Sequence, residues 1–183
     1  ENDYLEYREL TPDDPNFITE YRLLIDQSGK EIAEKLGELT EIIKAGQLRP
    51  WAFQNLEAFN VSWHLYQPLI YVNSQIVEIK PVVLESPGER DFVKDLQAFC
   101  EHTPDFFKDK ELYVLRNLSR GRGIGFFEAG NFHPDFIVWL VAGSRQHITF
   151  VDPKGIRNLE GKGDPKIQFH KTIKELESRL ADP

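Results

Sequence analysis

The sequence predicts an α/β fold whose core follows a helical and hairpin extension. Two observations carry this prediction. Residues 86–183 alternate between amphipathic helical spacing and short apolar runs of strand length, in the order helix, several strands, helix. Residues 1–85 begin with apolar side chains at helical spacing and then change to strand-like runs. A chain of 183 residues is long enough for one substantial core and an accessory lobe.

Composition excludes several classes of protein. Aromatic residues make up 12% of the chain, which is too many for a disordered protein. A single cysteine, Cys100, excludes a disulfide framework and a zinc or iron–sulfur site built from cysteines. No apolar run approaches the roughly 18–20 residues of a membrane helix, and no signal peptide opens the sequence, so we expect a cytoplasmic protein without a membrane partner. Methionine is absent, even from position 1, so we expect a segment of a longer protein.

The formal charge is divided unevenly along the chain. Residues 1–100 hold 18 acidic and 9 basic residues, whereas residues 101–183 hold 12 acidic and 13 basic residues. A net charge of -8 argues against a general nucleic-acid coat protein, whose affinity comes from many Lys and Arg contacts to phosphate. It leaves room for a nuclease, which needs carboxylates for a metal and only a local basic groove. We therefore look for function in the second half.

Helical spacing dominates residues 1–60, which we predict to be a helical accessory region. One helix is expected between residues 17 and 25, and Gly29 separates it from a second between residues 32 and 43. A third, short helix is expected over residues 49–60. The apolar positions of the three are Phe17, Tyr21, Leu24, Ile25, Ile32, Leu36, Leu39, Ile42, Ile43, Trp51 and Phe53.

Residues 61–85 are predicted to form a β-hairpin connecting segment. Strand-like runs cover residues 65–72 and 75–84. Asn73-Ser74 lies between them and is typical of a hairpin turn.

Residues 86–183 are predicted to form one domain that begins and ends with a helix. Residues 86–89, Ser-Pro-Gly-Glu, fit a capping box that opens a helix running to about residue 102. Asp164-Pro165 opens the last helix, with Phe169, Ile173, Leu176 and Leu180 on its apolar stripe. Strands are expected over residues 112–118, 124–128, 134–141 and 147–152. The third is apolar on both faces, so we expect it to be central and covered on both sides.

The hairpin of the last two predicted strands brings chemistry-bearing residues together. A loop over residues 142–146 gives a pairing in which Asp135 lies opposite Asp152. Because side chains alternate along a strand, Asp152 and Lys154 share a face if the strand continues that far. A slip of one residue would separate these groups, and the loop alone does not fix the register.

Two carboxylates this close repel each other unless a cation lies between them. Mg²⁺ prefers oxygen ligands and completes its coordination shell with water and phosphate oxygens. A neighbouring lysine can orient or deprotonate the attacking water and neutralise developing phosphate charge. The predicted cluster therefore has the components needed for phosphodiester hydrolysis.

Pro134-Asp135 followed by Asp152-Pro153-Lys154 resembles the motif of the PD-(D/E)XK nuclease superfamily. The surrounding strings are more narrowly similar to the C-terminal nuclease domain of type III restriction-like DEAD/DEAH-box helicases. These strings are GIGFFE at 123–128, NFHPDF at 131–136 and FVDPKG at 150–155. The resemblance covers roughly residues 86–180, with a weaker match at 64–69. It implies a restriction-endonuclease-like core of helix, mixed central sheet and helix.

The resemblance also implies roles for individual residues. Asp135 and Asp152 would be metal ligands, with the backbone carbonyl of Pro153 as a further ligand. Lys154 would be the catalytic lysine, and Glu89 would be the acid supplied by the first helix. The implied reaction is endonucleolytic cleavage of DNA with Mg²⁺, for which Mn²⁺ can substitute. No other cofactor is implied, and a helicase or ATPase is expected on the same polypeptide or on a partner.

The sequence leaves alternatives open at this site. Asp152-Pro153-Lys154-Gly155 also fits a type I turn, and Glu89 is also explained as a capping residue. Proline at the middle position departs from the family pattern, because it must lie at a strand end or edge. No strand is visible after the last helix. A non-catalytic DNA-binding or assembly module with the nuclease fold is the first alternative, and a small-molecule hydrolase is the second.

Basic residues near the predicted site are candidates for nucleic-acid binding. Arg120 and Arg122 lie in a glycine-rich turn that lacks the ending of a nucleotide-binding loop. Lys162 and Lys171 lie at and beyond the start of the last helix. We expect most of the other bases, including Arg116, Lys166 and Lys174, to be solvated surface charges. His133 and His170 are expected to be ordinary packing or surface residues, and the histidines show no zinc-like spacing.

Overall fold

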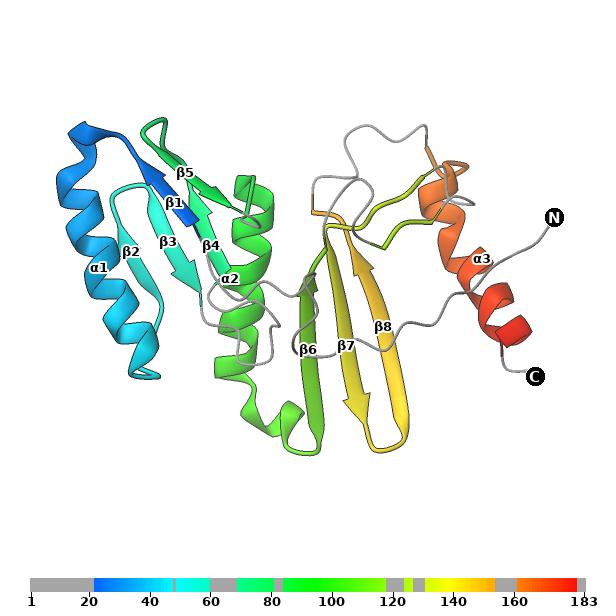
Figure 1. The fold of residues 1–183 in the computed structure, drawn as a ribbon. Coiled ribbons are helices and arrows are strands. Elements are labelled where there is room, and N and C mark those ends of the chain that lie inside the picture. The colour runs from blue at the N-terminus through cyan, green and yellow to red at the C-terminus, as the bar shows by residue number, and fades with distance from the viewer. Residues whose placement is uncertain are drawn as a thin grey trace.

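The described part of the chain folds as a mixed α/β protein with three α-helices and three small antiparallel sheets (Figure 1). This computed structural model describes residues 22–47, 49–59, 69–80, 84–117, 124–126, 131–153 and 161–180. No helix among these residues has the length and apolar character required to cross a membrane.

Two small sheets and one helix make up the N-terminal half. Strand β1 (Arg22–Ile25) pairs with β5 (Val77–Lys80), and β2 (Trp51–Phe53), β3 (Leu56–Phe59) and β4 (Leu69–Val72) form the second sheet in that order. Helix α1 (Lys30–Lys44) packs its apolar stripe on both sheets. The residues most buried in these contacts are Ile32, Leu39, Leu56, Ala58, Ile70 and Val77.

The prediction of a helical region over residues 1–60 is confirmed only for α1. Residues 22–25 form a strand, and residues 51–59 form a β-hairpin instead of a short helix. That hairpin turns at Gln54, whose φ of 50° lies in the left-handed region that favours glycine. Residues 1–21 lie outside the described part of the chain.

The hairpin predicted over residues 61–85 is wrong in its pairing. Strands form at β4 and β5, but among the described residues β4 pairs with β3 and β5 pairs with β1. The backbone N–H of Asn73 donates to the carbonyl of Asn55 at 2.9 Å, which continues the β3–β4 pairing past the expected turn. Long-range pairing therefore determined the partners of these strands, and the local turn signal did not.

The C-terminal half has the predicted order of helix, strands and helix. Its elements are α2 (Pro87–His102), the short 3₁₀ helix η2 (Pro104–Phe107), β6 (Lys110–Arg116), β7 (Phe136–Ala142), β8 (Arg145–Val151) and α3 (Pro165–Leu180). Ser86 caps α2 as predicted, because its side-chain oxygen accepts the backbone N–H of Glu89. β6, β7 and β8 form an antiparallel sheet in which β7 is central, as predicted. The mixed sheet that the family resemblance implied is therefore antiparallel over the described strands.

Helix α2 covers one face of this sheet and lies between it and the N-terminal strands (Figure 1). The Phe92 ring on α2 lies 4.9 Å from the ring of Phe136 on β7. One hydrophobic cluster joins both halves of the chain, and its buried members are Phe59, Leu69, Tyr71, Leu84, Val93, Leu112, Val114 and Phe136.

Among the described residues, those that pack on the opposite face of the sheet lie at one end of it. There Phe169 of α3 packs with Phe126, Phe132 and Phe150. Farther along, Tyr113 and Ile148 on the strands beside β7 are 39% and 52% exposed. The expectation that the central strand is covered along both faces is therefore only partly correct. Of the strand expected over residues 124–128, the described part contributes a single bridge between Phe126 and Phe132.

Candidate functional site

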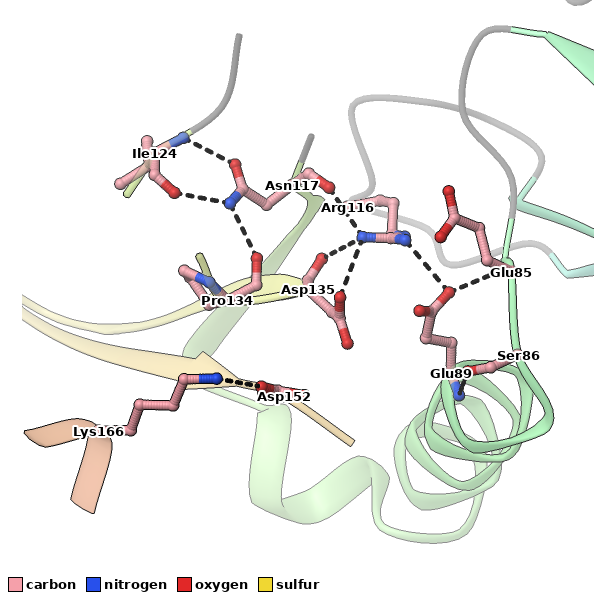
Figure 2. A network of polar contacts seen from close by, with 10 residues as sticks. All are labelled: Glu85, Ser86, Glu89, Arg116, Asn117, Ile124, Pro134, Asp135, Asp152 and Lys166. Carbon is pink, nitrogen blue, oxygen red and sulfur yellow. Dashed lines mark hydrogen bonds and ion pairs between the residues drawn. The ribbon is translucent and has the colours of Figure 1, made fainter. Parts of the chain in front are cut away.

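The two predicted metal ligands lie at the end of the sheet where β7 begins and β8 ends. The last pair in this ladder is Phe136 with Val151, so the register predicted from the sequence is confirmed. Asp135 directly precedes this pair and Asp152 directly follows it. Their side chains are 18% and 20% exposed, so both are largely shielded but reachable from solvent. Figure 2 shows Asp135 beside Arg116 and Asp152 beside Lys166.

Arg116 connects the acid on α2 to Asp135. Its Nη2 donates to Oε2 of Glu89 at 3.2 Å, and its Nη1 donates to the backbone carbonyls of Asn117 at 2.8 Å and Asp135 at 2.9 Å. Nη1 also lies 3.8 Å from Oδ1 of Asp135, so one guanidinium contacts both acids (Figure 2). The Glu89 side chain is completely buried, and the Arg116 side chain is 6% exposed.

The location of Arg116 corrects the expectation that it is a solvated surface charge. Leu112, Val114 and Arg116 are the buried positions of β6, at every second residue. The same period of two was visible in the sequence and is the signal that would have placed Arg116 inside. Its guanidinium carbon lies 5.3 Å from the centre of the Phe136 ring, which adds a cation–π contact.

Glu89 also completes the N-terminus of α2. Its Oε2 accepts the backbone N–H of Glu85 at 2.7 Å, one residue earlier than a standard capping box would place this bond. The negative charge lies in the first turn, where the helix dipole favours it. The structure thus gives Glu89 two partners that hold it in place, a helix end and a buried arginine.

Asn117 ties together three segments around the site. Its backbone N–H donates to the carbonyl of Asp135 at 2.8 Å, and its side-chain Nδ2 donates to the carbonyls of Ile124 and Pro134, each at 2.8 Å. Its Oδ1 accepts the backbone N–H of Ile124 at 2.9 Å (Figure 2). Sequence reasoning did not identify Asn117, and its place directly before the glycine-rich turn was the only available signal.

Pro153 lies against the first turn of α2. A Cβ placed on Gly88 would lie 3.6 Å from both the Cβ and the carbonyl oxygen of Pro153, so the two backbones approach closely. β8 ends at Val151, which satisfies the requirement that this proline lie beyond the regular ladder. The segment that carries Asp152 and the turn that carries Glu89 are therefore neighbours.

Some predicted basic residues lie outside the described part of the chain, and others lie on its surface. Lys154, Arg120 and Arg122 belong to the first group. Lys162 and Lys171 are exposed, the first before α3 and the second on it.

Two residues that sequence reasoning treated as ordinary lie near the site. Lys166, in the first turn of α3, has its Nζ 3.9 Å from Oδ2 of Asp152. The imidazole of His133 occupies the space where a Cβ on Gly125 would lie, which explains a glycine there. Gly125 and His133 each adjoin a member of the antiparallel bridge between Phe126 and Phe132.

Asp135 and Asp152 are the carboxylates that could contribute oxygen ligands to a cation at this sheet end. Within the described residues, no group of three or more His, Cys, Asp or Glu side chains is arranged to hold a metal. Arg116 lies 3.2 Å from Glu89 and 3.8 Å from Asp135, and Lys166 lies 3.9 Å from Asp152. Mg²⁺ commonly takes one or two carboxylates and fills its shell with water and phosphate, so Asp135 and Asp152 would suffice as its side-chain ligands.

No protein-family model, curated protein or solved structure matches this chain. A functional assignment therefore depends on the geometry of the site itself.

Proposed function

We propose that this chain is a divalent-metal-dependent nuclease domain that hydrolyses DNA phosphodiester bonds as an endonuclease. We further propose that it belongs to a larger helicase or restriction-type protein, as its resemblance to the PD-(D/E)XK superfamily implies. DNA would be the substrate, Mg²⁺ the cofactor, and Mn²⁺ an effective substitute.

The register of β7 and β8 is the observation that carries this proposal. It brings Asp135 and Asp152 to the same end of the sheet, on two strands that share their last pair. The first turn of α2 lies at the same end, because Gly88 lies close to Pro153 and Glu89 pairs with Arg116. A buried acid on α2 and a carboxylate beside each of β7 and β8 follow one another along the chain in the order of the motif, which supports the proposal.

Each residue has a proposed part in the reaction. Asp135 and Asp152 would hold Mg²⁺, with the carbonyl of Pro153 as a further ligand. The metal supplies a polarised water and neutralises charge on the phosphate. Lys154 would orient that water, as the resemblance implies. Glu89 would act through Arg116, which holds the backbone carbonyl of Asp135 and so fixes its side chain at the sheet end.

We propose that four basic side chains, those of Arg120, Arg122, Lys162 and Lys171, contact the DNA. Arg120 and Arg122 lie in the sequence between Asn117 and Ile124, which are hydrogen-bonded to each other, Lys162 precedes α3 and Lys171 lies on it. Each lysine or arginine that contacts a phosphate makes binding more sensitive to salt.

Cleavage of plasmid and single-stranded DNA in Mg²⁺ or Mn²⁺ tests the proposal. We expect metal-dependent nicking that falls by about 100-fold or more in Asp135→Asn, Asp152→Asn and Lys154→Ala, the loss typical of removing a group that stabilises a transition state. Asp105→Asn is the matched control, because Asp105 is an exposed acid on η2. Cleavage that survives the Asp135 and Asp152 substitutions would contradict the assignment.

A non-catalytic DNA-binding or assembly module is the second candidate. The observation that favours it is the position of Arg116, whose buried positive charge already contacts Glu89 and Asp135. A protein of this kind would bind DNA without cleaving it, and would not bind Mn²⁺ through Asp135 and Asp152.

A further inference from the structure

Lys166, like Arg116, is a basic residue that the structure brings to this end of the sheet. It lies in the first turn of α3, and its Nζ faces the Asp152 carboxylate at 3.9 Å (Figure 2). The sequence motif did not indicate it, because fourteen positions separate the two residues and only the fold brings them together.

The position of Lys166 is fixed by its surroundings. Its backbone N–H donates to Oδ1 of Asp164 at 2.9 Å, which anchors the start of α3. Its ammonium lies 5.6 Å from the centre of the Phe132 ring, and that ring packs on Phe169 one turn further along the helix. The first turn of α3 is therefore held against the end of the sheet that carries Asp152.

Lys166 and Arg116 differ in what they can bind. The Arg116 side chain is 6% exposed and donates to Glu89 and to two backbone carbonyls. The Lys166 side chain is 39% exposed, and 3.9 Å is beyond hydrogen-bonding distance from the Asp152 oxygen. Its N–H groups therefore remain able to donate to an anion that approaches from solvent.

We infer that Lys166 binds a backbone phosphate of the nucleic-acid strand at the site. This inference rests on the proposed function and names the group that contacts the substrate. The attraction to Asp152 holds the ammonium over the sheet end, and a phosphate there gains a hydrogen-bonded cation next to the carboxylate proposed as a metal ligand. A structural role is the competing explanation, in which Lys166 only ties α3 to β8.

DNA binding and DNA cleavage, measured separately in Lys166→Ala, test this inference. Binding is followed by the anisotropy of a labelled single-stranded oligonucleotide in Ca²⁺ over a series of salt concentrations, and cleavage is followed in Mg²⁺. Lys174→Ala is the control, since it removes an equal charge from an exposed position two turns further along α3. Thermal unfolding shows whether each variant folds.

We expect Lys166→Ala to weaken binding about tenfold and to reduce the slope of log affinity against log salt by about 0.7, the value for one lost phosphate contact on a single strand. Lys174→Ala should stay within about twofold of the original chain. If Lys166→Ala matches Lys174→Ala, or weakens binding with no change in slope, the inference is wrong. If the original chain cleaves no DNA but Lys166→Ala still reduces the slope of log affinity against log salt, the phosphate contact is supported and the nuclease assignment is refuted. Cleavage and binding that are both unaffected would support the nuclease and refute the inference.

Discussion

Replacing Arg116 with methionine tests how much of the protein's stability depends on the buried charge of this one residue. Methionine keeps most of the aliphatic length of arginine but removes the guanidinium. The Glu89 carboxylate, with no exposed surface, then loses the cation 3.2 Å away. The carbonyls of Asn117 and Asp135 lose their hydrogen bonds from Nη1 in the same step.

The size of the effect follows from the burial of the pair. Removing one partner of a buried, hydrogen-bonded ion pair costs about 3–5 kcal/mol of unfolding free energy, because the other charge is left in the interior. Arg90→Met on α2 is the matched control. The Arg90 side chain is 31% exposed and pairs with Asp91 and Glu57 near the surface, where solvent screens ion pairs and they contribute little to stability.

Urea unfolding followed by circular dichroism measures these differences. Glu89→Gln in the Arg116→Met background removes the remaining buried charge, and its amide oxygen can still accept the N–H of Glu85. We expect this double variant to be more stable than Arg116→Met alone by at least about 1 kcal/mol. Equal losses in Arg116→Met and Arg90→Met, or a double variant as unstable as the sum of its parts, would refute the reasoning.

Three further predictions test packing and burial near the site and on α2. Gly125→Ala should lower the free energy of unfolding by about 1–3 kcal/mol, because its Cβ would overlap the His133 ring. The same substitution in a His133→Ala background should have little effect on urea unfolding. An equal loss in the original chain and in His133→Ala would contradict this reasoning. Asn117→Ala should lower the free energy of unfolding by about 2–3 kcal/mol and speed hydrogen exchange of the Ile124 amide, which donates to Asn117 Oδ1. Unchanged protection of that amide would show that this hydrogen bond does not hold the segment. Burial raises the pKa of the Cys100 thiol, so iodoacetamide should alkylate it more slowly than free cysteine at pH 8, with the rate rising at higher pH; a rate equal to that of free cysteine would contradict this.

Local sequence signals predicted the elements whose structure is set locally. The stripe from Ile32 to Ile43 became α1, and Ser86 and Pro87 opened α2, because spacing and caps act over a few residues. The β7–β8 register was also predictable, because a tight turn with Gly143 at φ +61° joins two runs of seven residues.

Elements that depend on distant partners were not predictable in this way. β2 and β3 turn at Gln54, a residue with no intrinsic preference for positive φ, so no turn signal marked the hairpin. β4 and β5 flank a sequence typical of a turn, yet each completes a sheet with an earlier strand. β4 packs against both α1 and α2 and β5 packs against α1, and these contacts come from residues far from the local turn.

In the candidate site, too, some residues were predictable from local sequence and others were not. Asp135 and Asp152 followed from the strand register expected for the last hairpin, which the observed β7–β8 pairing confirms. The Arg116–Glu89 pair and the Lys166–Asp152 contact join residues from different elements, and only the packing of α2 and α3 on the sheet brings them together.

Mn²⁺ binding measured by isothermal titration calorimetry tests most directly whether Asp135 and Asp152 together form a metal site. The original chain, Asp135→Asn, Asp152→Asn and the control Asp105→Asn are titrated under the same conditions. Our account predicts one Mn²⁺ bound per chain in the original and control proteins, and affinity at least about tenfold weaker in both site variants, because each loses a charged oxygen ligand. A chain that binds no Mn²⁺, or that binds it equally well after either substitution, would contradict the account.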